Sequence, residues 1–173
     1  DEVFGAGMNG EIQNVAWGLY AREPMTAADG SVIPADGLLA LAYCDKAGEI
    51  VFSADLPVDC KVYAKEYSTD GHYILSDKEY DLEFSYQGQD VPVVTLSVND
   101  GQPIENKLIR GDVTGYKVDD DGAPVDGALI GLFRPDETEF TEENALMTCV
   151  SMAGGKFGFY SVAAGDWQIR EIA

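Results

Sequence analysis

Apolar and polar side chains alternate along almost the whole chain, with the period of two residues that is typical of strands with one buried face. Gly, Asp, Asn and Pro interrupt the alternation at short intervals and predict turns. The expected strands cover residues 12–21, 38–44, 49–54, 60–67, 80–86, 91–98, 104–109, 113–118, 128–134, 147–151, 156–160 and 166–172. The acid-rich segment 138–147 is the one helical candidate, of a turn or two. Short strands at this spacing predict an all-β protein built of β-sandwiches.

The alternating pattern contains an internal repeat. The segment NVAWGLYA at residues 14–21 resembles GALIGLFR at residues 127–134, with Gly-Leu-aromatic in register. Residues 44–67 likewise resemble residues 150–172. Both contain Ala-Gly, an alternating strand, a short loop, a second alternating strand and then a basic residue followed by Glu. Such self-similarity indicates two copies of one structural module.

Glu66 and Glu171 occupy the same place in the two copies. Further strand-like segments follow Glu66, so the first module is expected over residues 1–110. The second module is expected over residues 111–173, where the chain ends shortly after the matching Glu. The predicted fold is therefore two tandem β-sandwich modules, the second incomplete.

The charge of the chain excludes one class of partner. Acids outnumber bases 31 to 11, which gives a net charge of −20. Binding of nucleic acid needs clustered Lys and Arg, and an anionic membrane surface would repel this chain. No segment is long and apolar enough to insert into a bilayer, and no signal, sorting or lipidation motif is present. We expect the acids mainly to solvate the surface.

Metal and cofactor sites have little support in the sequence. The acidic run at residues 119–122 is a good turn, and it suggests calcium as an alternative, but it lacks the spaced ligands of an EF-hand loop. No Cys/His cluster has the spacing of a zinc site. We therefore expect neither a metal nor a cofactor.

Cysteine, histidine and tryptophan are scarce. Cys44, Cys60 and Cys149 are an odd number without a close pair, so each is expected to be a small buried residue, and a bridge between the first two is the alternative. His72 is the only histidine and is expected in a turn or at a strand edge. A hydrolase would have to be built around this one residue. Trp17 and Trp167 are expected in the core, one per module.

The repeated segments resemble the SpaA-type, or Cna B-type, modules of Gram-positive surface proteins, pilins and adhesins, which are prealbumin-like (Ig-like) β-sandwiches. The resemblance rests on a first-strand lysine, Lys117, in KVDDDGAPVDGALIGLF, on the hairpin GGKFGF and on the strand ending in Lys/Arg-Glu. The segment PIENKLIRG, with Asn106, resembles the last strand of such a module, running directly into the next one.

The resemblance implies an intramolecular isopeptide bond between the first-strand Lys and the last-strand Asn, promoted by an acid between them. Glu66 and Glu171 would be the promoting acids, and Asn106 and Lys117 the bonding residues. Desolvation drives a buried Lys toward its neutral, nucleophilic form and a buried Glu toward its protonated form. Attack of the amine on the carboxamide expels ammonia and leaves a neutral amide in place of costly buried charges.

Each copy lacks one of the three residues. The first contains Glu66 and Asn106 but no first-strand lysine, which we expect upstream of residue 1. The second contains Lys117 and Glu171 but no last-strand asparagine. The sequence is therefore expected to be a fragment, trimmed inside both modules.

These observations predict a structural stalk segment of a cell-surface adhesin or pilin-like protein that presents a distal adhesive region. Its expected partners are neighbouring modules of the same polypeptide, with a host or matrix ligand bound through other domains. It would be extracellular, either wall-anchored or secreted. It would not be a turnover enzyme, because isopeptide formation occurs once per molecule. The alternative is a module that binds a carbohydrate or a host protein, which an exposed cluster of aromatic side chains would favour.

Overall fold

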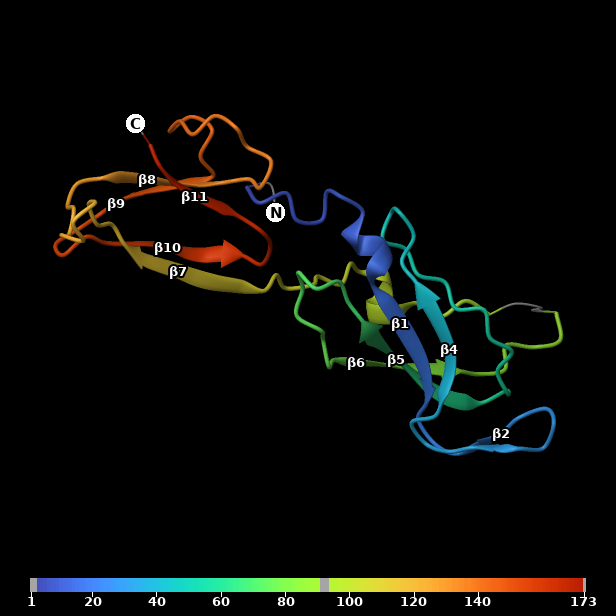
Figure 1. The fold of residues 1–173 in the computed structure, drawn as a ribbon. Helices are drawn as coiled ribbons and strands as arrows, with labels where there is room; N and C mark the ends of the chain where they lie inside the picture. The colour runs from blue at the N-terminus through green and yellow to red at the C-terminus, as the bar shows by residue number, and fades with distance from the viewer. Residues whose placement is uncertain (1–2, 91–93, 173) are drawn as a thin grey trace. The chain divides into compact units, whose positions relative to one another are not determined.

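The computed structural model describes residues 3–90 and 94–172 and shows an all-β protein, as the alternating pattern predicted (Figure 1). Within these described ranges, the only helices are two four-residue 3-10 turns. The elements are η1 (Glu11–Asn14), β1 (Ala16–Ala21), β2 (Met25–Thr26), β3 (Val32–Ile33), β4 (Leu38–Tyr43), β5 (Cys60–Ser68), β6 (Glu79–Phe84), η2 (Val98–Gly101), β7 (Arg110–Tyr116), β8 (Leu129–Phe133), β9 (Met147–Val150), β10 (Lys156–Ala163) and β11 (Gln168–Glu171).

The chain divides into two compact units. The N-terminal unit is Gly7–Lys107, and the C-terminal unit begins at Leu108. The division therefore lies slightly before the boundary at residue 110 that the repeat suggested. Residues 3–6 belong to the C-terminal unit and not to the first module. The reason is apolar packing, because Phe4 contacts the C-terminal core and stands edge-on to Trp167 at 5.3 Å between ring centroids.

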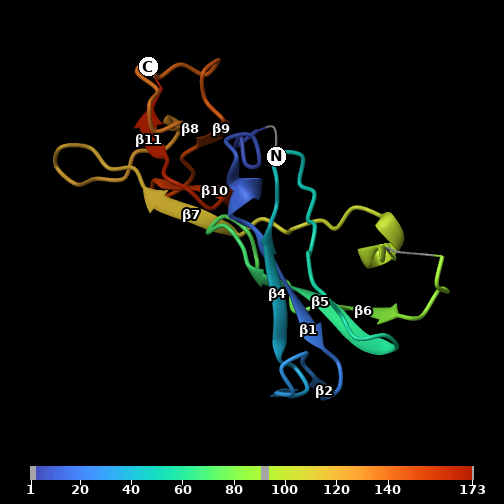
Figure 2. The ribbon, with the colours of Figure 1, turned by 90° about the vertical axis from the view of Figure 1, so that its right-hand side faces the viewer.

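The N-terminal unit contains a four-stranded antiparallel sheet in the order β4-β1-β5-β6. These strands lie side by side in both ribbon views (Figures 1 and 2). The inner face of the sheet carries the unit's apolar core. Its buried residues are Val15, Trp17, Leu19, Cys44, Cys60, Val62 and Ala64.

The layer opposite this sheet is irregular, which corrects three of the expected strands. Residues 49–54, 94–98 and 104–109 form no strand, and residues 91–93 lie outside the described residues. Apolar side chains from these segments still pack on the core: Ile50, Phe52, Val98 and Ile104. The alternating pattern thus identified their burial. A strand, however, also needs a hydrogen-bonded ladder, and among the described residues these segments have no more than one isolated bridge, at Leu108.

The C-terminal unit is a β-sandwich of two sheets, with the orders β11-β8-β9 and β10-β7. Its core consists of Ile130, Leu132, Phe159 and Val162, with Trp167 packed against them. The helical candidate at residues 138–147 is wrong, because these residues form an irregular loop with one turn before β9 begins.

The remaining differences concern short elements and cysteines. The paired strands β2 and β3 were not expected, since their segment reads as turn residues. All three cysteines are free, with Cys44 and Cys60 buried and Cys149 partly buried. The bridge between Cys44 and Cys60 does not form, because β1 lies between β4 and β5 and the two residues pack in separate core clusters.

Candidate functional site

The two glutamates of the repeat occupy matching positions in their sheets. Glu66 of β5 pairs with Trp17, immediately before the Gly-Leu-aromatic motif of β1. Glu171 of β11 pairs with Ile130, immediately before the same motif in β8. Residues that pair across neighbouring strands point to the same side of a sheet. Both glutamates therefore belong to the inner, core-facing side.

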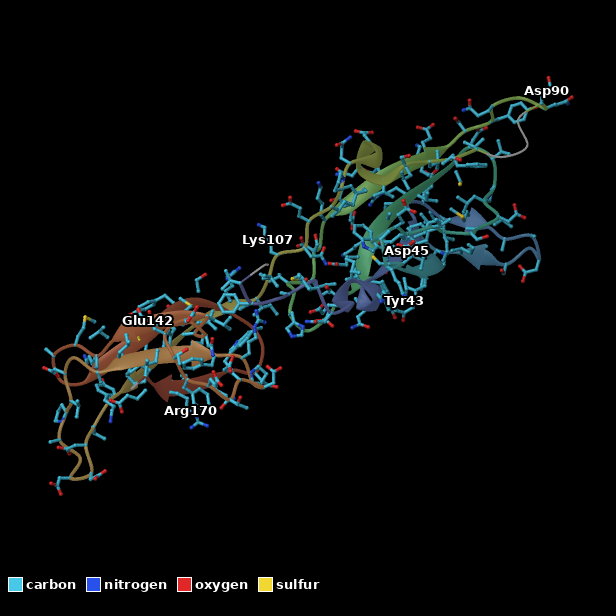
Figure 3. The ribbon with its side chains drawn as sticks, turned by 90° about the horizontal axis from the view of Figure 1, so that it is seen from above. Tyr43, Asp45, Asp90, Lys107, Glu142 and Arg170 are labelled. Atoms are coloured by element: carbon cyan, nitrogen blue, oxygen red, sulfur yellow. The ribbon has the colours of Figure 1, made fainter. Side chains whose placement is uncertain are left out.

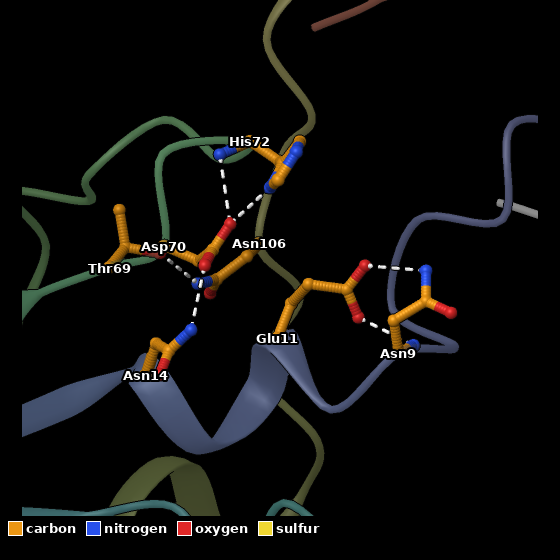
Figure 4. A network of polar contacts seen from close by, with 7 residues as sticks. All are labelled: Asn9, Glu11, Asn14, Thr69, Asp70, His72 and Asn106. Atoms are coloured by element: carbon orange, nitrogen blue, oxygen red, sulfur yellow. Dashed lines mark hydrogen bonds and ion pairs between the residues drawn. The ribbon is translucent and has the colours of Figure 1, made fainter. Parts of the chain in front are cut away.

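In the N-terminal unit the glutamate lies against the amide that the resemblance singled out. Glu66 is buried, with 2% of its surface exposed. Its Oε1 accepts a hydrogen bond from Asn106 Nδ2 at 2.6 Å, and its Oε2 accepts one from the backbone N–H of Ser76 at 2.6 Å. Asn106 Nδ2 also donates to Thr69 Oγ1 at 3.2 Å (Figure 4). Both carboxyl oxygens and the amide nitrogen are thus held in place.

The β5–β6 loop, residues 69–76, supplies these contacts and is itself braced. Asp70 Oδ2 accepts a hydrogen bond from Asn14 Nδ2 at 2.8 Å, and Asp70 Oδ1 accepts one from the backbone N–H of His72 at 3.1 Å and contacts its ring (Figure 4). The Asn14 and His72 side-chain hydrogen bonds hold the pKa of Asp70 below its ordinary value. His72 is thus a turn residue, as expected.

A further backbone bond ties this loop to the segment that carries Asn106. The N–H of Ile74 donates to the carbonyl of Lys107 at 2.7 Å. Within the described residues, Glu66 makes no ion pair. The site therefore presents a buried carboxyl group and a carboxamide without a positively charged partner.

The C-terminal unit holds the complementary pair. Lys117 Nζ lies 3.4 Å from Glu171 Oε2 and donates to the carbonyl of Val118 at 3.1 Å. The Lys117 side chain is 28% exposed, whereas that of Glu171 is 53% exposed. The Glu171 carboxylate is therefore largely open to solvent. Loop 69–76 and Asn106 cover Glu66, and no counterpart of them among the described residues covers Glu171.

The backbone of Lys117 is fixed by a close approach to Gly155. The N–H of Lys117 donates to the Gly155 carbonyl at 2.7 Å. Gly155 has a φ of +72°, and a Cβ at this position would lie 2.2 Å from the Lys117 carbonyl oxygen. Only glycine fits there. The glycine of the GGKFGF hairpin thus positions Lys117, which directly follows the end of β7.

Sequence reasoning named Glu66, Asn106, Lys117 and Glu171 but missed the residues that hold the first pair. Thr69, Asp70 and Ser76 lie in a polar loop where Ser, Thr and Asp are expected merely as turn formers. Nothing in their pattern distinguishes a residue that contacts Glu66 or Asn106 from one that faces solvent.

Other candidate sites take structural roles. Asp119 Oδ1 accepts hydrogen bonds from the backbone N–H groups of Asp121 and Ala123, so it stabilises its own turn. Within residues 3–90 and 94–172, no cluster of three His, Cys, Asp or Glu side chains is suited to hold a metal ion. No helix in these ranges is long and apolar enough to cross a membrane. The two tryptophans pack in the cores, Trp17 in the N-terminal and Trp167 in the C-terminal unit.

No protein-family model matches the sequence, and no curated protein matches it. Solved structures do match. The Bacillus anthracis TIE protein matches 92% of this chain and 25% of its own, with 14% identity and a TM-score of 0.58. A streptococcal ancillary pilin matches 92% of this chain and 48% of its own, with 19% identity and a TM-score of 0.37. The shaft pilin SpaA from Lactobacillus rhamnosus GG matches 91% and 76%, with 14% identity and a TM-score of 0.28.

The chain thus spans 25% of the first of these proteins and 48% of the second. The likeness to the Bacillus anthracis protein carries the conclusion, and at 14% identity it concerns the fold alone. At this level the predicted fold class is confirmed: the chain is an all-β protein whose fold is similar to that of the Bacillus anthracis TIE protein.

Proposed function

We propose that this chain is a structural stalk segment of a cell-surface or secreted protein, which presents a distal adhesive region and is reinforced by Lys–Asn isopeptide bonds. The observation that carries the proposal is the buried Glu66 carboxyl group, 2.6 Å from the Asn106 amide and without an ion-pair partner among the described residues. The duplicated module and the all-β fold support the stalk role. Partners would be adjoining modules, and the protein would not turn over a substrate.

The proposed bond forms in one balanced step that involves no redox change. A neutral lysine amine attacks Cγ of Asn106 while the Glu66 carboxyl group, which accepts a hydrogen bond from the Asn106 amide, holds the carboxamide in place. The bond from Cγ to Nδ2 breaks, the proton of the amine passes to the leaving nitrogen, and ammonia departs. The product is a neutral amide between the two side chains, so no charge remains buried. Glu171 would act in the same way on Lys117 and an asparagine.

The experiment supplies the N-terminal unit with a lysine strand. Residues 110–118, which contain β7 and Lys117, are fused ahead of residue 1 through a flexible Gly/Ser linker, so that the added lysine has a high effective concentration. Loss of one ammonia lowers the intact mass by about 17 Da. We expect this loss, together with a cross-linked tryptic peptide that contains Asn106.

Two controls accompany the fusion. Replacing the added lysine by arginine, or Glu66 by glutamine, should leave the full mass while circular dichroism remains that of a folded β protein. A fusion that keeps its full mass, or a cross-link that persists in Glu66→Gln, would contradict the proposed chemistry.

The alternative function, binding of a carbohydrate or a host protein, also has an observation in its favour. The tryptophans are in the cores, but exposed tyrosines lie on the outer face of the N-terminal sheet. Tyr43 is 61% exposed and Tyr67 is 50% exposed. This face leads to a separate inference.

A further inference from the structure

The outer face of the β4-β1-β5-β6 sheet carries apolar side chains that the chain leaves uncovered. Tyr20 of β1 pairs with Leu38 of β4 and with Tyr63 of β5, so these residues point to the same side. Leu41 and Tyr43 follow Leu38 on that side of β4 by their pairing with β1, and Tyr67 follows Tyr63 on β5. The exposed members, between 42% and 61% exposed, are Leu38, Leu41, Tyr43 and Tyr67 (Tyr43 is labelled in Figure 3). Tyr20 is partly buried.

The same face of the C-terminal unit is covered. Phe133 stands where Tyr20 stands in the Gly-Leu-aromatic motif, and it is 0% exposed. In each unit the aromatic ring lies across the motif's glycine, because a Cβ added to Gly18 or Gly131 would lie 2.5 Å from the ring of Tyr20 or Phe133. The difference is Phe140, which stands edge-on to Phe133 at 5.1 Å and shields it from solvent.

Phe140 belongs to the acidic loop between β8 and β9, and two outward-facing residues of β11 hold this loop in place. The Arg170 guanidinium lies 5.2 Å from the centre of the Phe140 ring. Gln168 Nε2 donates to the Pro135 carbonyl at 2.8 Å and to the Glu137 carbonyl at 3.2 Å. An aromatic side chain in a glutamate-rich irregular loop is thus bound by an aromatic ring and a basic residue of the sheet.

The N-terminal unit has counterparts of Phe133 and Arg170, namely Tyr20 and Lys65, but its described residues include no loop that covers them as the Phe140 loop does. Lys65, at the position of Arg170, pairs with Glu79 across the ladder, but the Glu79 carboxylate is bound by Arg22 at 2.8 Å. Lys65 makes no ion pair with any residue in the described ranges. The segment between β1 and β4, which would correspond to the covering loop, forms the β2–β3 pair instead and leaves Leu38, Leu41 and Tyr43 exposed.

We propose that this outer face, formed by Tyr20, Leu38, Leu41, Tyr43, Lys65 and Tyr67, binds a loop segment of a partner protein in which an aromatic side chain is flanked by glutamates. The aromatic ring would stand on Tyr20 as Phe140 stands on Phe133, and Lys65 would face the acids. Edge-to-face ring pairs and desolvated charge pairs both favour such binding. Glu79, Asp81 and Glu83 of β6 lie on the same face, opposite Lys65, Tyr63 and Lys61, and Arg22 binds the first two. The three acids are thus matched by Arg22, Lys61 and Lys65, and at physiological salt a Debye length of about 8 Å screens the more distant negative charges of the chain.

The test uses the full chain and a synthetic peptide of residues 135–146, PDETEFTEENAL, as the probe. We expect NMR shift changes confined to the outer-face residues of β1, β4 and β5, in about 0.15 M salt. Lys65→Glu and Tyr67→Ser should each weaken binding about tenfold, and a peptide with Phe replaced by Ala should bind about tenfold more weakly. Lys156→Glu makes the same change in net charge in the C-terminal unit, and Tyr86→Ser removes another exposed tyrosine, so both should leave the affinity unchanged.

Several results would overturn the proposal. One is the absence of shift changes at millimolar peptide. Another is binding that Lys65→Glu and Tyr67→Ser leave unaltered. If sedimentation showed concentration-dependent self-association that protects the outer face, a second copy of this chain would be its occupant. If oligosaccharides shifted the tyrosine signals and the peptide did not, the face would bind a glycan. The isopeptide chemistry at Glu66 is unaffected by any of these outcomes, since it lies on the inner side of the sheet.

Discussion

At the scale of single residues, Glu66 and Glu171 hold matching positions in the repeat but differ in their burial. Glu66 and Glu171 both follow a basic residue near the end of a strand and both pair with the residue before the Gly-Leu-aromatic motif. Glu66 is buried and bound by an amide and a backbone N–H, whereas the Glu171 side chain is 53% exposed and faces Lys117. Burial by neighbouring segments therefore decides how much each carboxyl group contributes to the stability of its unit.

Removal of Glu66 should destabilise the N-terminal unit. Glu66→Ala leaves the part-buried Ser76 N–H and one part-buried Asn106 N–H without their acceptor, and an unsatisfied buried donor costs about 1–3 kcal/mol. We expect a loss of about 2–4 kcal/mol in the free energy of unfolding, measured by urea unfolding at the NMR methyl signals of Val62.

Glu171→Ala is the matched control. Its ion pair with Lys117 is largely open to solvent, and such surface pairs contribute at most about 1 kcal/mol. The Val62 signals should unfold at the same urea concentration as in the parent chain. A Glu66→Ala protein as stable as the Glu171→Ala protein would contradict the buried hydrogen-bond network.

The raised pKa of Tyr63 predicts that the N-terminal unit loses stability at high pH. Burial and a hydrogen bond from its hydroxyl to Asp36 raise its pKa from 10.0 to about 12. Because the folded pKa exceeds the unfolded one, the stabilisation is complete below pH 10 and is lost as the pH rises through 12. The urea midpoint of the N-terminal unit should therefore fall between these values. In Tyr63→Phe the fall should be smaller, and absorbance at 295 nm should lack the corresponding late titration.

At the scale of elements, period-two alternation predicted every strand of the four-stranded N-terminal sheet and of the two C-terminal sheets, because alternate residues of these strands face a core. The same pattern wrongly assigned strands to residues 49–54 and 104–109. Alternation reports burial, and a ladder partner is a separate, long-range requirement. The helical candidate failed for a different reason. Phe140 buries itself on Phe133, and this tertiary contact overrides the helix propensity of the glutamates around it.

Residues 3–6, which precede the N-terminal unit in sequence, should stabilise the C-terminal unit. Phe4 packs on the C-terminal core and on Trp167, and Arg134 Nη2 donates to the Val3 carbonyl at 3.2 Å. Phe4→Ala removes this half-buried ring, at a cost of about 1–2 kcal/mol. Hydrogen exchange should become faster for the amides of β8 and β11.

Two controls belong to the same experiment. The amides of β1 and β5 should exchange as before, because they lie in the N-terminal unit. Met8→Ala, at a position 72% exposed, should change neither set of amides. Equal acceleration in both units would show that residues 3–6 do not act specifically on the C-terminal unit.

At the scale of the whole molecule, the candidate site was foreseeable only through the repeat. The repeat aligned Glu66 with Glu171, and the family resemblance added Asn106 and Lys117. Two of these residues, Glu66 and Asn106, lie 40 positions apart and meet through a hydrogen bond. Thr69 and Ser76 could not be foreseen, because the fold of a loop decides which of its polar groups turn toward a buried carboxyl group.

Asn106 and Lys117 lie in different units, which predicts that this chain contains no isopeptide bond. Asn106 belongs to the N-terminal unit and Lys117 to the C-terminal unit, and each faces a glutamate without the other bonding residue. The amine and the carboxamide must be held in contact around one acid for ammonia to leave. We therefore expect the intact mass of this chain to equal its sequence mass. A deficit of about 17 Da, with a tryptic cross-link that contains Asn106 or Lys117, would show that a residue of this chain is the missing partner.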